Sequence, residues 1–397
     1  MTAAFVSRRA ERLRLWTPRF YFLFLVVLLL GPAEAALSSP RQDLVAVALG
    51  NKAYFAGGDG IPYYDTVDIF DGASNGWSTA KLSLARSALA AASVGSKILF
   101  AGGVSAVGPS DVVDIYDVPS GTWAVSKLSV PRGSLAATSS GSLAFFGGGL
   151  GNLSVGSSSR VDVYNSDTNT WSTLELSSAR HDLAATAAEG QVFFAGGSVA
   201  LAGSTTVSST SSIVDVFHLS NNSWTVTSMQ KPRRSFVAAS VGTKVFFACG
   251  ASSTSTSSYI TDVDIYDLST ANWTYYTLST GRYELTAAAI GGKVIFAGGR
   301  YATSTGSAYW VNSVNIFDNA TGLWTTSSLS SSRAGLSSAA LATGKKLLVG
   351  GGYTSSSSAS SRVDIYDSST GFWSNDMLSV PRYQLAAAAN GNKLLFN

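Results

Sequence analysis

The fold of this chain is decided by a repeated unit whose clearest copy is residues 86–123, RSALAAASVGSKILFAGGVSAVGPSDVVDIYDVPSGTW. An arginine opens the unit, an alanine-rich run and an apolar run follow, and a diglycine separates them from a Val-Asp-Ile-Tyr-Asp segment and a tryptophan. The order recurs seven times, with spacings of 46 to 53 residues between the tryptophans. These are Trp77, Trp123, Trp171, Trp224, Trp273, Trp324 and Trp373. Such a period indicates a repeat architecture whose units bury their faces only by stacking on one another.

Each unit predicts four short strands. In the copy quoted above we expect strands at 89–94, 97–101 and 112–116, and a fourth that carries Trp123. The alanine run is too short for a stable helix, and its small side chains suit a position near a crowded axis. The diglycine ends the second strand because glycine tolerates positive φ. The large tryptophan side chain is expected to cover the seam to the next unit.

The order of these features resembles the kelch repeat, and the resemblance covers residues 41–396. It implies an all-β fold, a seven-bladed β-propeller with four antiparallel strands in each blade. Residues 382–396 repeat the first two strands an eighth time, so a partial eighth repeat stands at the C-terminus. Three alternatives remain open. The C-terminal pair closes the ring with the first unit, or residues 41–58 do so and leave a spare hairpin, or the gene model is truncated.

Residues 1–35 are predicted to be a signal peptide. Five arginines precede an apolar run of eleven residues, Phe20–Leu30, and the small-residue site Ala33-Glu34-Ala35 follows. This order is typical of a secretory signal, and the run is shorter than the roughly 20 residues of a spanning helix. We expect cleavage after Ala35 and a secreted, extracellular propeller domain at 36–397 without membrane insertion. The alternative is a membrane anchor formed by an uncleaved signal segment.

Charge and cysteine content narrow the function classes. The leader holds five arginines and two acids, a net charge of +3, and the whole chain also carries +3, so the mature domain is about neutral. It therefore lacks the basic footprint expected of a nucleic-acid-binding protein. The single cysteine, Cys249, cannot form an intrachain disulfide, and a small buried thiol is its favoured interpretation. We expect a monomer. Four Asn-x-Ser/Thr sequons predict N-glycosylation: Asn152, Asn221, Asn272 and Asn319.

The repeated arginines are the first candidate binding residues. Each stands before the innermost strand of a blade, so together they are expected to ring one mouth of the central channel, where they would suit carboxylate or phosphate groups. The residues after them vary, which is typical of a binding rim, and the kelch resemblance implies that peptide ligands dock there. The structural alternative is that each arginine holds neighbouring loops. The candidates are Arg41, Asp43, Arg86, Arg132, Arg180, His181, Asp182, Arg233, Arg234, Arg282, Tyr283, Glu284, Arg333, Arg382 and Tyr383, joined by Tyr309 and Trp310, which are expected to be an exposed pair in a variable loop.

The favoured function is noncatalytic binding of an unknown extracellular protein or glycan. Only two histidines exist, His181 and His218, and they are expected at opposite ends of the blades, so no metal site and no cofactor is predicted. Kelch-like copper oxidases need a histidine pair that is missing here. One enzyme alternative remains, a sugar mutarotase or epimerase that would use His181, Asp182, Glu284 and Asp43 as acid–base groups. Catalysis is thus uncertain and less favoured than binding.

Overall fold

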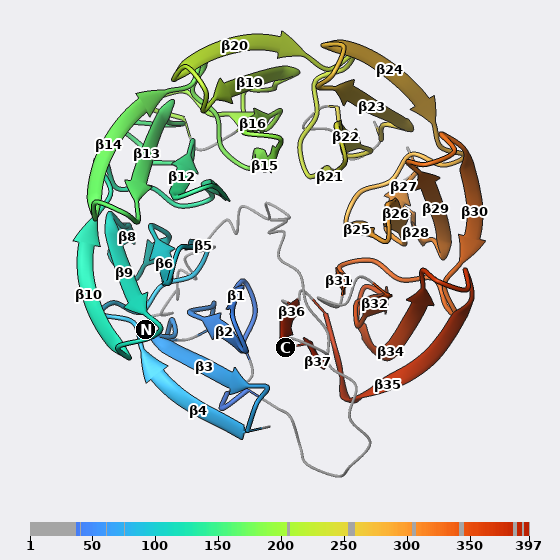
Figure 1. Cartoon of the computed structure of the whole chain (residues 1–397), viewed down its shortest axis with the longest axis horizontal. Coiled ribbons are helices and arrows are strands. Elements are labelled where there is room, and N and C mark those ends of the chain that lie inside the picture. The colour runs from blue at the N-terminus through green and yellow to red at the C-terminus, as the bar shows by residue number, and fades with distance from the viewer. Residues whose placement is uncertain are drawn as a thin grey trace, which may run out of the picture.

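The computed structural model describes residues 37–396 except 40, 61, 75, 205–206, 253–258, 304–306, 341–344, 384–386 and 391–392. The predicted signal peptide lies outside these residues. Within them every regular element is a strand, and seven antiparallel sheets, each containing the four strands of one blade, stand around a central axis (Figure 1). The expected all-β, seven-bladed propeller is therefore confirmed.

Each blade uses four strands that follow one another along the chain. Blade 1 comprises β1 (Val45–Leu49), β2 (Lys52–Ala56), β3 (Thr66–Asp71) and β4 (Gly76–Lys81); blade 2 β5 (Ala90–Val94), β6 (Lys97–Ala101), β9 (Val112–Asp117) and β10 (Thr122–Lys127); blade 3 β11 (Ala136–Ser140), β12 (Leu143–Gly147), β13 (Arg160–Asn165) and β14 (Thr170–Glu175). Blade 4 comprises β15 (Ala184–Ala188), β16 (Gln191–Ala195), β19 (Ile213–His218) and β20 (Ser223–Ser228); blade 5 β21 (Val237–Val241), β22 (Lys244–Ala248), β23 (Asp262–Asp267) and β24 (Asn272–Thr277). Blade 6 comprises β25 (Thr286–Ile290), β26 (Lys293–Ala297), β29 (Ser313–Asp318) and β30 (Trp324–Ser328); blade 7 β31 (Ser337–Ala340), β32 (Lys346–Gly350), β34 (Ser358–Asp367) and β35 (Trp373–Arg382).

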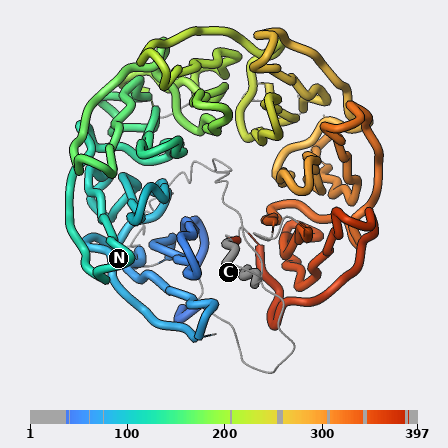
Figure 2. The backbone as a smooth tube through the Cα atoms, viewed as in Figure 1, coloured from blue at the N-terminus to red at the C-terminus, as the bar shows by residue number. Residues whose placement is uncertain are grey.

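Short additional strands lie in the loops between the second and third strands of four blades. They are β7 (Val104–Ser105) with β8 (Gly108–Pro109), β17 (Ser198–Val199) with β18 (Ser209–Thr210), β27 (Arg300–Ala302) with β28 (Ala308–Trp310), and β33 (Tyr353–Ser355), which pairs with β34. The backbone tube in Figure 2 shows how every blade runs from the channel outward before the chain crosses to the next blade. The alanine-rich strands are innermost, as their small side chains predict.

The diglycine links neighbouring blades. The N–H of Gly103, the second glycine, donates to the carbonyl of Arg132 in the next blade at 2.9 Å, and equivalent bonds join Gly58 to Arg86 and Gly352 to Arg382. Gly102, the first glycine, has φ +64°, and a Cβ there would stand 2.5 Å from the same Arg132 carbonyl oxygen. Both the conformation and the close approach therefore require glycine.

The apolar core is divided into seven clusters, one at each seam between blades. Trp123 illustrates the arrangement: its ring lies 4.8 Å from Tyr116 and 6.1 Å from Phe100 in its own blade. The same cluster holds Tyr54 and Val47 of blade 1. The tryptophans therefore cover the seam to the preceding blade, and the expectation that they face the next blade is wrong. The fourth strand is the outermost, so the direction in which blades lean decides which neighbour it covers.

The ring closes with a spare hairpin. Strand β1 pairs with β2, and β2 pairs with β3 in blade 1, so residues 41–58 complete the first unit. The C-terminal strands β36 (Ala387–Asn390) and β37 (Lys393–Phe396) form a separate two-stranded sheet among the described residues. β36 lies between β31 of blade 7 and β1 of blade 1, where Ala387 joins the apolar cluster of that seam (Figure 1). The second of the predicted closures is thus the one that the structure adopts.

Candidate functional site

The seven repeated arginines lie inside the blades. Arg132 is typical: its Nε donates to the carbonyl of Gly148 at 2.7 Å, and its Nη2 donates to the carbonyl of Phe146 at 2.9 Å. These carbonyls stand at the end of β12, where the diglycine ends the strand. The side chains of Arg41, Arg86, Arg132, Arg180, Arg233, Arg282 and Arg333 have no exposed surface. The predicted ring of ligand-binding guanidinium groups at the channel mouth is therefore wrong for these seven, and the structural alternative applies.

A buried aspartate neutralises most of these arginines. Asp162, on the third strand of blade 3, lies 2.7 Å from Arg132 Nη2 and also accepts the backbone N–H of Ser129 at 2.9 Å. Burial lowers the pKa of Arg132, and the negative charge of Asp162 opposes this shift. Six such ion pairs exist in the described structure: Arg41–Asp68, Arg86–Asp114, Arg132–Asp162, Arg180–Asp215, Arg233–Asp264 and Arg333–Asp364. A buried pair of this kind is retained because an unpaired buried charge is costly.

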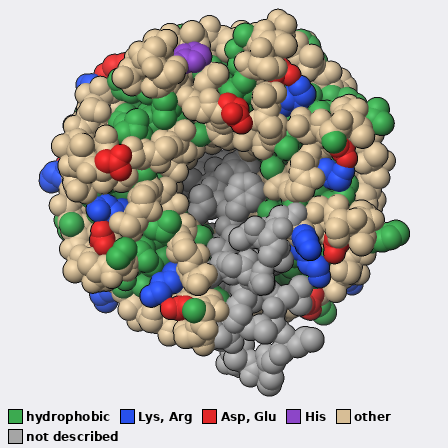
Figure 3. Space-filling model, viewed as in Figure 1, with side chains coloured by type: hydrophobic (Ala, Val, Ile, Leu, Met, Phe, Trp, Pro, Cys, Tyr) green, Lys and Arg blue, Asp and Glu red, His purple; other side chains and the backbone are tan. Residues whose placement is uncertain are grey.

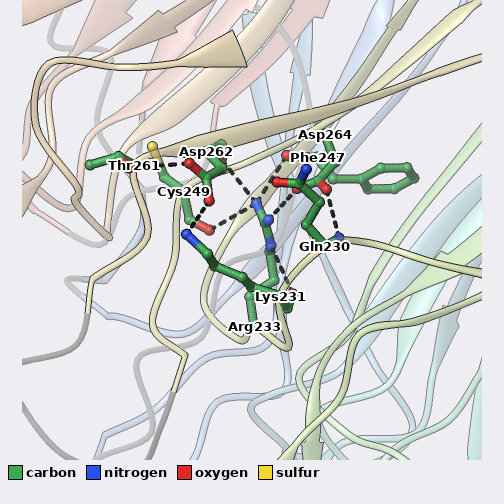
Figure 4. Close-up of polar contacts among 8 residues, drawn as sticks. All are labelled: Gln230, Lys231, Arg233, Phe247, Cys249, Thr261, Asp262 and Asp264. Atoms are coloured by element: carbon green, nitrogen blue, oxygen red, sulfur yellow. Dashed lines mark hydrogen bonds and ion pairs between the residues drawn. The ribbon is translucent and has the colours of Figure 1, made fainter. Parts of the chain in front are cut away.

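Blade 5 shows the arrangement together with the single cysteine (Figure 4). Arg233 pairs with Asp264 and donates to the carbonyls of Phe247 at 3.1 Å and Asp262 at 3.0 Å. Cys249 replaces the first glycine, has φ +62° and is completely buried. Burial raises the pKa of its thiol, while Arg282 and Arg233 oppose the shift. Cys249 is thus the buried free thiol that the sequence favoured.

Blade 6 departs from the pattern. Asn315 stands where the other blades have aspartate, and its Oδ1 accepts a hydrogen bond from Arg282 Nη2 at 2.9 Å. Arg282 is completely buried, and its Nε makes no hydrogen bond within the described residues. Burial lowers the pKa of Arg282, with only the influence of Cys249 opposing the shift. This arginine is therefore the least compensated of the seven.

The residues after the arginines form the rim of the channel, and most are partly or fully buried. His181 is 2% exposed, and its Nδ1 lies 2.9 Å from Ser157 Oγ, whereas its Nε2 lies 3.8 Å from Asp182 Oδ2. Asp43, Asp182 and Glu284 belong to blades 1, 4 and 6, and all three have positive φ. The candidate acid–base residues are thus distributed around the ring.

Six residues over blades 5 to 7 do come together, and we call them the aromatic patch: Tyr259, Tyr283, Arg300, Trp310, Tyr353 and Tyr383. Tyr259 and Tyr283 stack with ring centroids 4.9 Å apart and planes 3° apart. The Arg300 guanidinium lies 4.7 Å from the Tyr283 centroid and 5.4 Å from that of Tyr353. Tyr353 in turn meets Trp310 and Tyr383 edge-on, at 6.2 and 5.7 Å.

An ion pair holds the patch in place. Glu284 binds Arg300 through two hydrogen bonds, Nε to Oε2 at 2.6 Å and Nη2 to Oε1 at 2.9 Å. The backbones of Tyr283 and Arg300 exchange two further bonds of 2.9 Å each. Burial raises the pKa values of Tyr283 and Glu284, and Arg300 opposes both shifts. A bidentate pair with both partners fixed by the backbone gives the patch a defined shape.

The hairpin β27–β28 divides its aromatic residues between two faces. Arg300 is paired with Trp310 and Tyr301 with Tyr309, so the two pairs point to opposite sides. Tyr301 and Tyr309 stack at 5.3 Å, and Tyr309 is 47% exposed. Trp310 is only partly exposed, against Tyr353. The expectation of an exposed Tyr309-Trp310 pair is therefore correct for Tyr309 and wrong for Trp310.

The remaining candidates lie at the edges of these groups. Arg234 is partly buried, and its backbone bridges Ala251. Arg382 is partly exposed at the end of β35, and Tyr383 is 47% exposed within the patch. Among the sequons, Asn221, Asn272 and Asn319 lie in or beside the turns between third and fourth strands, whereas Asn152 lies in the loop between β12 and β13. Their glycosylation stays a prediction.

Arg300 is the residue that sequence reasoning missed. It is the first residue after the diglycine of blade 6. In every blade, a backbone bridge joins the residue at this position to the first residue after the repeated arginine, as in Tyr283–Arg300 and Ala334–Tyr353. The spacing of the repeat could have predicted that these two positions lie side by side within a blade. The contact between Arg300 and Tyr353, however, becomes evident only when the neighbouring blades 6 and 7 are placed side by side.

On one face of the ring, the surface charge does not favour one sign. Figure 3 shows one face of the ring, where acidic and basic side chains alternate around the rim and no single sign gathers. In the part of the chain that the structure describes, no group of three or more His, Cys, Asp or Glu residues could hold a metal ion. The same residues contain no helix long and apolar enough to span a membrane.

Comparisons with known proteins agree with this architecture. A family model described as the KLHDC2/KLHL20/DRC7 Kelch-repeats domain matches residues 88–299 and, in a second alignment, 183–396, so the matches together reach across more than half of the chain. No curated protein matches the sequence. Among solved structures, one titled "Structure of YjhT" has a TM-score of 0.50 at 14% sequence identity, covering 73% of this chain and 97% of that one. At this identity the likeness concerns the fold alone.

Proposed function

This chain belongs to the kelch-repeat family, and from that premise we propose that it is a noncatalytic scaffold that binds an extracellular protein through the aromatic patch. The proposal is carried by one observation: six aromatic or guanidinium side chains from three blades are packed into one partly exposed surface and fixed by the Glu284–Arg300 pair. Because function must come from a site and not from a fold, this surface is where binding should be sought.

The chemistry of the patch suits a protein ligand. Tyrosine, tryptophan and arginine are the residues that most often dominate binding energy at interfaces. Their rings are already stacked in the free protein, so little conformational entropy is lost when a partner docks. Since Glu284 neutralises Arg300, the patch should select for aromatic, apolar and hydrogen-bonding groups of the ligand more than for its negative charge.

The alternative of a sugar mutarotase or epimerase gains no support from the geometry. Glu284 is committed to Arg300, and His181 is buried against Ser157. A general acid or base must reach its substrate within hydrogen-bonding distance. We keep this alternative as an outcome of the experiment below, together with binding of a glycan.

The proposed setting is extracellular, because the expected signal peptide would export the domain. We further propose that the secreted domain is a monomer without a cofactor, and that its sequons carry glycans. Most sequons would then lie on the side of the ring opposite the patch.

The experiment uses the secreted chain on arrays of peptides and glycans, with Tyr383→Ala as the variant in the patch. Tyr275→Ala is the matched control, because Tyr275 on β24 is 48% exposed, against 47% for Tyr383, and lies on an outer strand. Loss of an aromatic anchor should weaken binding by about tenfold or more. Equal binding by Tyr383→Ala and the control would place the site elsewhere. Binding or turnover of sugars alone would replace the protein-ligand proposal with one of the alternatives.

A further inference from the structure

The loops of blades 3 and 4 present three exposed aliphatic side chains on the rim side of the ring. Leu153 and Val155, in the loop between β12 and β13, are 55% and 57% exposed, and Leu201, in the loop between β16 and β19, is 61% exposed. We call these three residues the aliphatic patch. No charged residue occurs at 150–158 or at 198–204. Clustered exposed apolar side chains mark either a surface that something covers or a risk of aggregation.

Hydrogen bonds join the two loops and hold the patch in place. The N–H of Gly203 donates to the carbonyl of Leu153 at 2.8 Å, and the N–H of Ser157 donates to the carbonyl of Ala200 at 2.9 Å. The N–H of Ala200 donates in return to Ser157 Oγ at 2.8 Å, and this hydroxyl also lies 2.9 Å from His181 Nδ1. The aliphatic patch is therefore a defined feature of the fold, anchored to the buried histidine of the rim.

The sequon asparagine Asn152 lies in the same turn as two of these side chains. The N–H groups of Val155 and Gly156 both donate to its carbonyl at 3.0 Å. Its Oδ1 accepts the backbone N–H of Ser154 at 3.1 Å and the Ser154 hydroxyl at 2.7 Å. Its Nδ2, the atom to which an N-linked glycan is joined, makes no hydrogen bond within the described residues. A glycan on Asn152 would therefore begin directly beside Leu153 and Val155.

We propose that an N-linked glycan on Asn152 packs over the aliphatic patch and shields it from solvent and from protein partners. Such a glycan is bulky and solubilising, which is what an exposed apolar cluster requires. The inference rests on the proposed export and glycosylation of the domain, and it adds a structural role for one glycan. It also leaves the aromatic patch over blades 5 to 7 as the open part of the rim.

The composition of the patch favours a glycan over a protein as its occupant. Leucine and valine are under-represented among the residues that dominate binding at protein interfaces, and the patch has no tyrosine, tryptophan or arginine anchor. A sugar ring can place C–H groups against aliphatic side chains, and its hydroxyls can bond to the serines of the loops. Covalent attachment one residue before Leu153 gives the glycan a high effective concentration, so weak contacts are sufficient.

The sequon at Asn221 is a matched control, because it has the same local geometry without the apolar surroundings. Asn221 Oδ1 accepts the backbone N–H of Ser223 at 3.2 Å and the Ser223 hydroxyl at 2.8 Å. The turn that holds it, residues 219–223, contains no exposed large apolar side chain. A glycan on Asn221 should therefore be attached equally well but should have no apolar surface to cover.

The test uses the full chain secreted from eukaryotic cells. Glycopeptide mass spectrometry measures occupancy at Asn152 and Asn221, and the fluorescence of the dye anilinonaphthalene sulfonate measures exposed apolar surface. We expect both sites to be occupied, and we expect Asn152→Gln, but not Asn221→Gln, to raise the dye fluorescence and to delay elution from a hydrophobic-interaction column. Adding Leu153→Ser and Leu201→Ser to Asn152→Gln should return both readouts toward those of the wild type.

Enzymatic removal of the glycans from the folded protein keeps the test independent of how well a variant folds. It should raise the dye fluorescence of the wild type much more than that of Asn152→Gln. A glycan on Asn221 but not on Asn152 would overturn this inference alone, whereas the absence of glycans from every sequon would overturn it together with the proposed glycosylation. Equal dye fluorescence of Asn152→Gln and Asn221→Gln would refute the shielding role. A protein ligand that binds the glycosylated chain and is lost in Leu201→Ser would make a protein the occupant and would also refute it.

Discussion

The substitution Asn315→Asp should stabilise the protein, because it supplies the carboxylate that Arg282 lacks in blade 6. Arg282 is completely buried and holds Asn315 Oδ1 at 2.9 Å, whereas the six equivalent arginines each face an aspartate. The new carboxylate needs no rearrangement, since aspartate and asparagine have the same shape.

The magnitude is the difference between two large terms. Opposite charges about 4 Å apart attract by about 4 kcal/mol at an effective dielectric constant of 20. Burying a carboxylate costs several kcal/mol. The cost of burying the Arg282 charge is the same in the wild type and in the variant, so it does not enter the difference. We expect a net gain of about 1–2 kcal/mol in the free energy of unfolding. At about 2 cal/mol/K of unfolding entropy per residue, the melting temperature should rise by about 1–3 °C.

Differential scanning calorimetry measures this gain, with two companion variants. Asp264→Asn creates the blade 6 arrangement in blade 5 and should lose about 2–3 kcal/mol, because the Arg233 charge is left without a carboxylate. Asn222→Asp adds the same charge at an exposed turn and should change the melting temperature little. If Asn315→Asp lowers the melting temperature while Asn222→Asp does not, desolvation outweighs the ion pair, and the reasoning about the buried ring is refuted.

Three further predictions concern the frame of the propeller. Gly102→Ala should lower the free energy of unfolding by about 2–4 kcal/mol, because at φ +64° its Cβ would stand 2.5 Å from the Arg132 carbonyl oxygen. Gly141→Ala, at φ +58° with nothing within 4 Å, should lower it by only about 1–2 kcal/mol. Equal losses in urea unfolding would contradict the steric argument. Lys97 and Ser120 lower the pKa of Asp117 from 3.8 to about 2, so its contribution is present above pH 3.8 and is lost as the pH falls toward 2. The difference in melting temperature between wild type and Asp117→Asn should therefore narrow across that interval, and a constant difference would disprove the link. Cys249 should resist alkylation in the native protein and react after unfolding, because it is buried with a raised pKa; rapid native labelling would show that the seam opens.

The strands of the repeat were predictable from the sequence. Strands at 97–101 and 112–116 follow directly from the alternation of apolar residues between Gly95 and the turn at Asp117, and the structure confirms both. Local patterning is sufficient there, because each strand and turn is decided by residues that are neighbours in the chain. The aspartate at this position of the third strand in six of the seven units was an unused signal: a charge inside an apolar strand needs a buried partner, and the arginine is repeated at the same period.

The candidate site was less predictable. The position of Arg132 in the repeat predicts that it lies near the channel mouth. It does not predict the direction of its side chain, which is decided by the carbonyls of Gly148 and Phe146 that accept its hydrogen bonds. Trp310 was expected to be exposed beside Tyr309, yet strand alternation within β28 turns it toward Tyr353. The aromatic patch depends on residues from three blades, and their contacts arise only when those blades stack.

By itself, the sequence determined the unit, its four strands, the number of complete blades and the small side chains at the axis, because these depend on periodicity and on local conformational preference. Only the tertiary structure decided which neighbour each tryptophan covers, that the arginines are buried, how the ring closes and where the rim becomes a surface. The physical reason is that these features depend on distances between residues far apart in the chain. Such distances are set by the stacking of whole blades, as the different environments of Arg132 and Arg382 demonstrate.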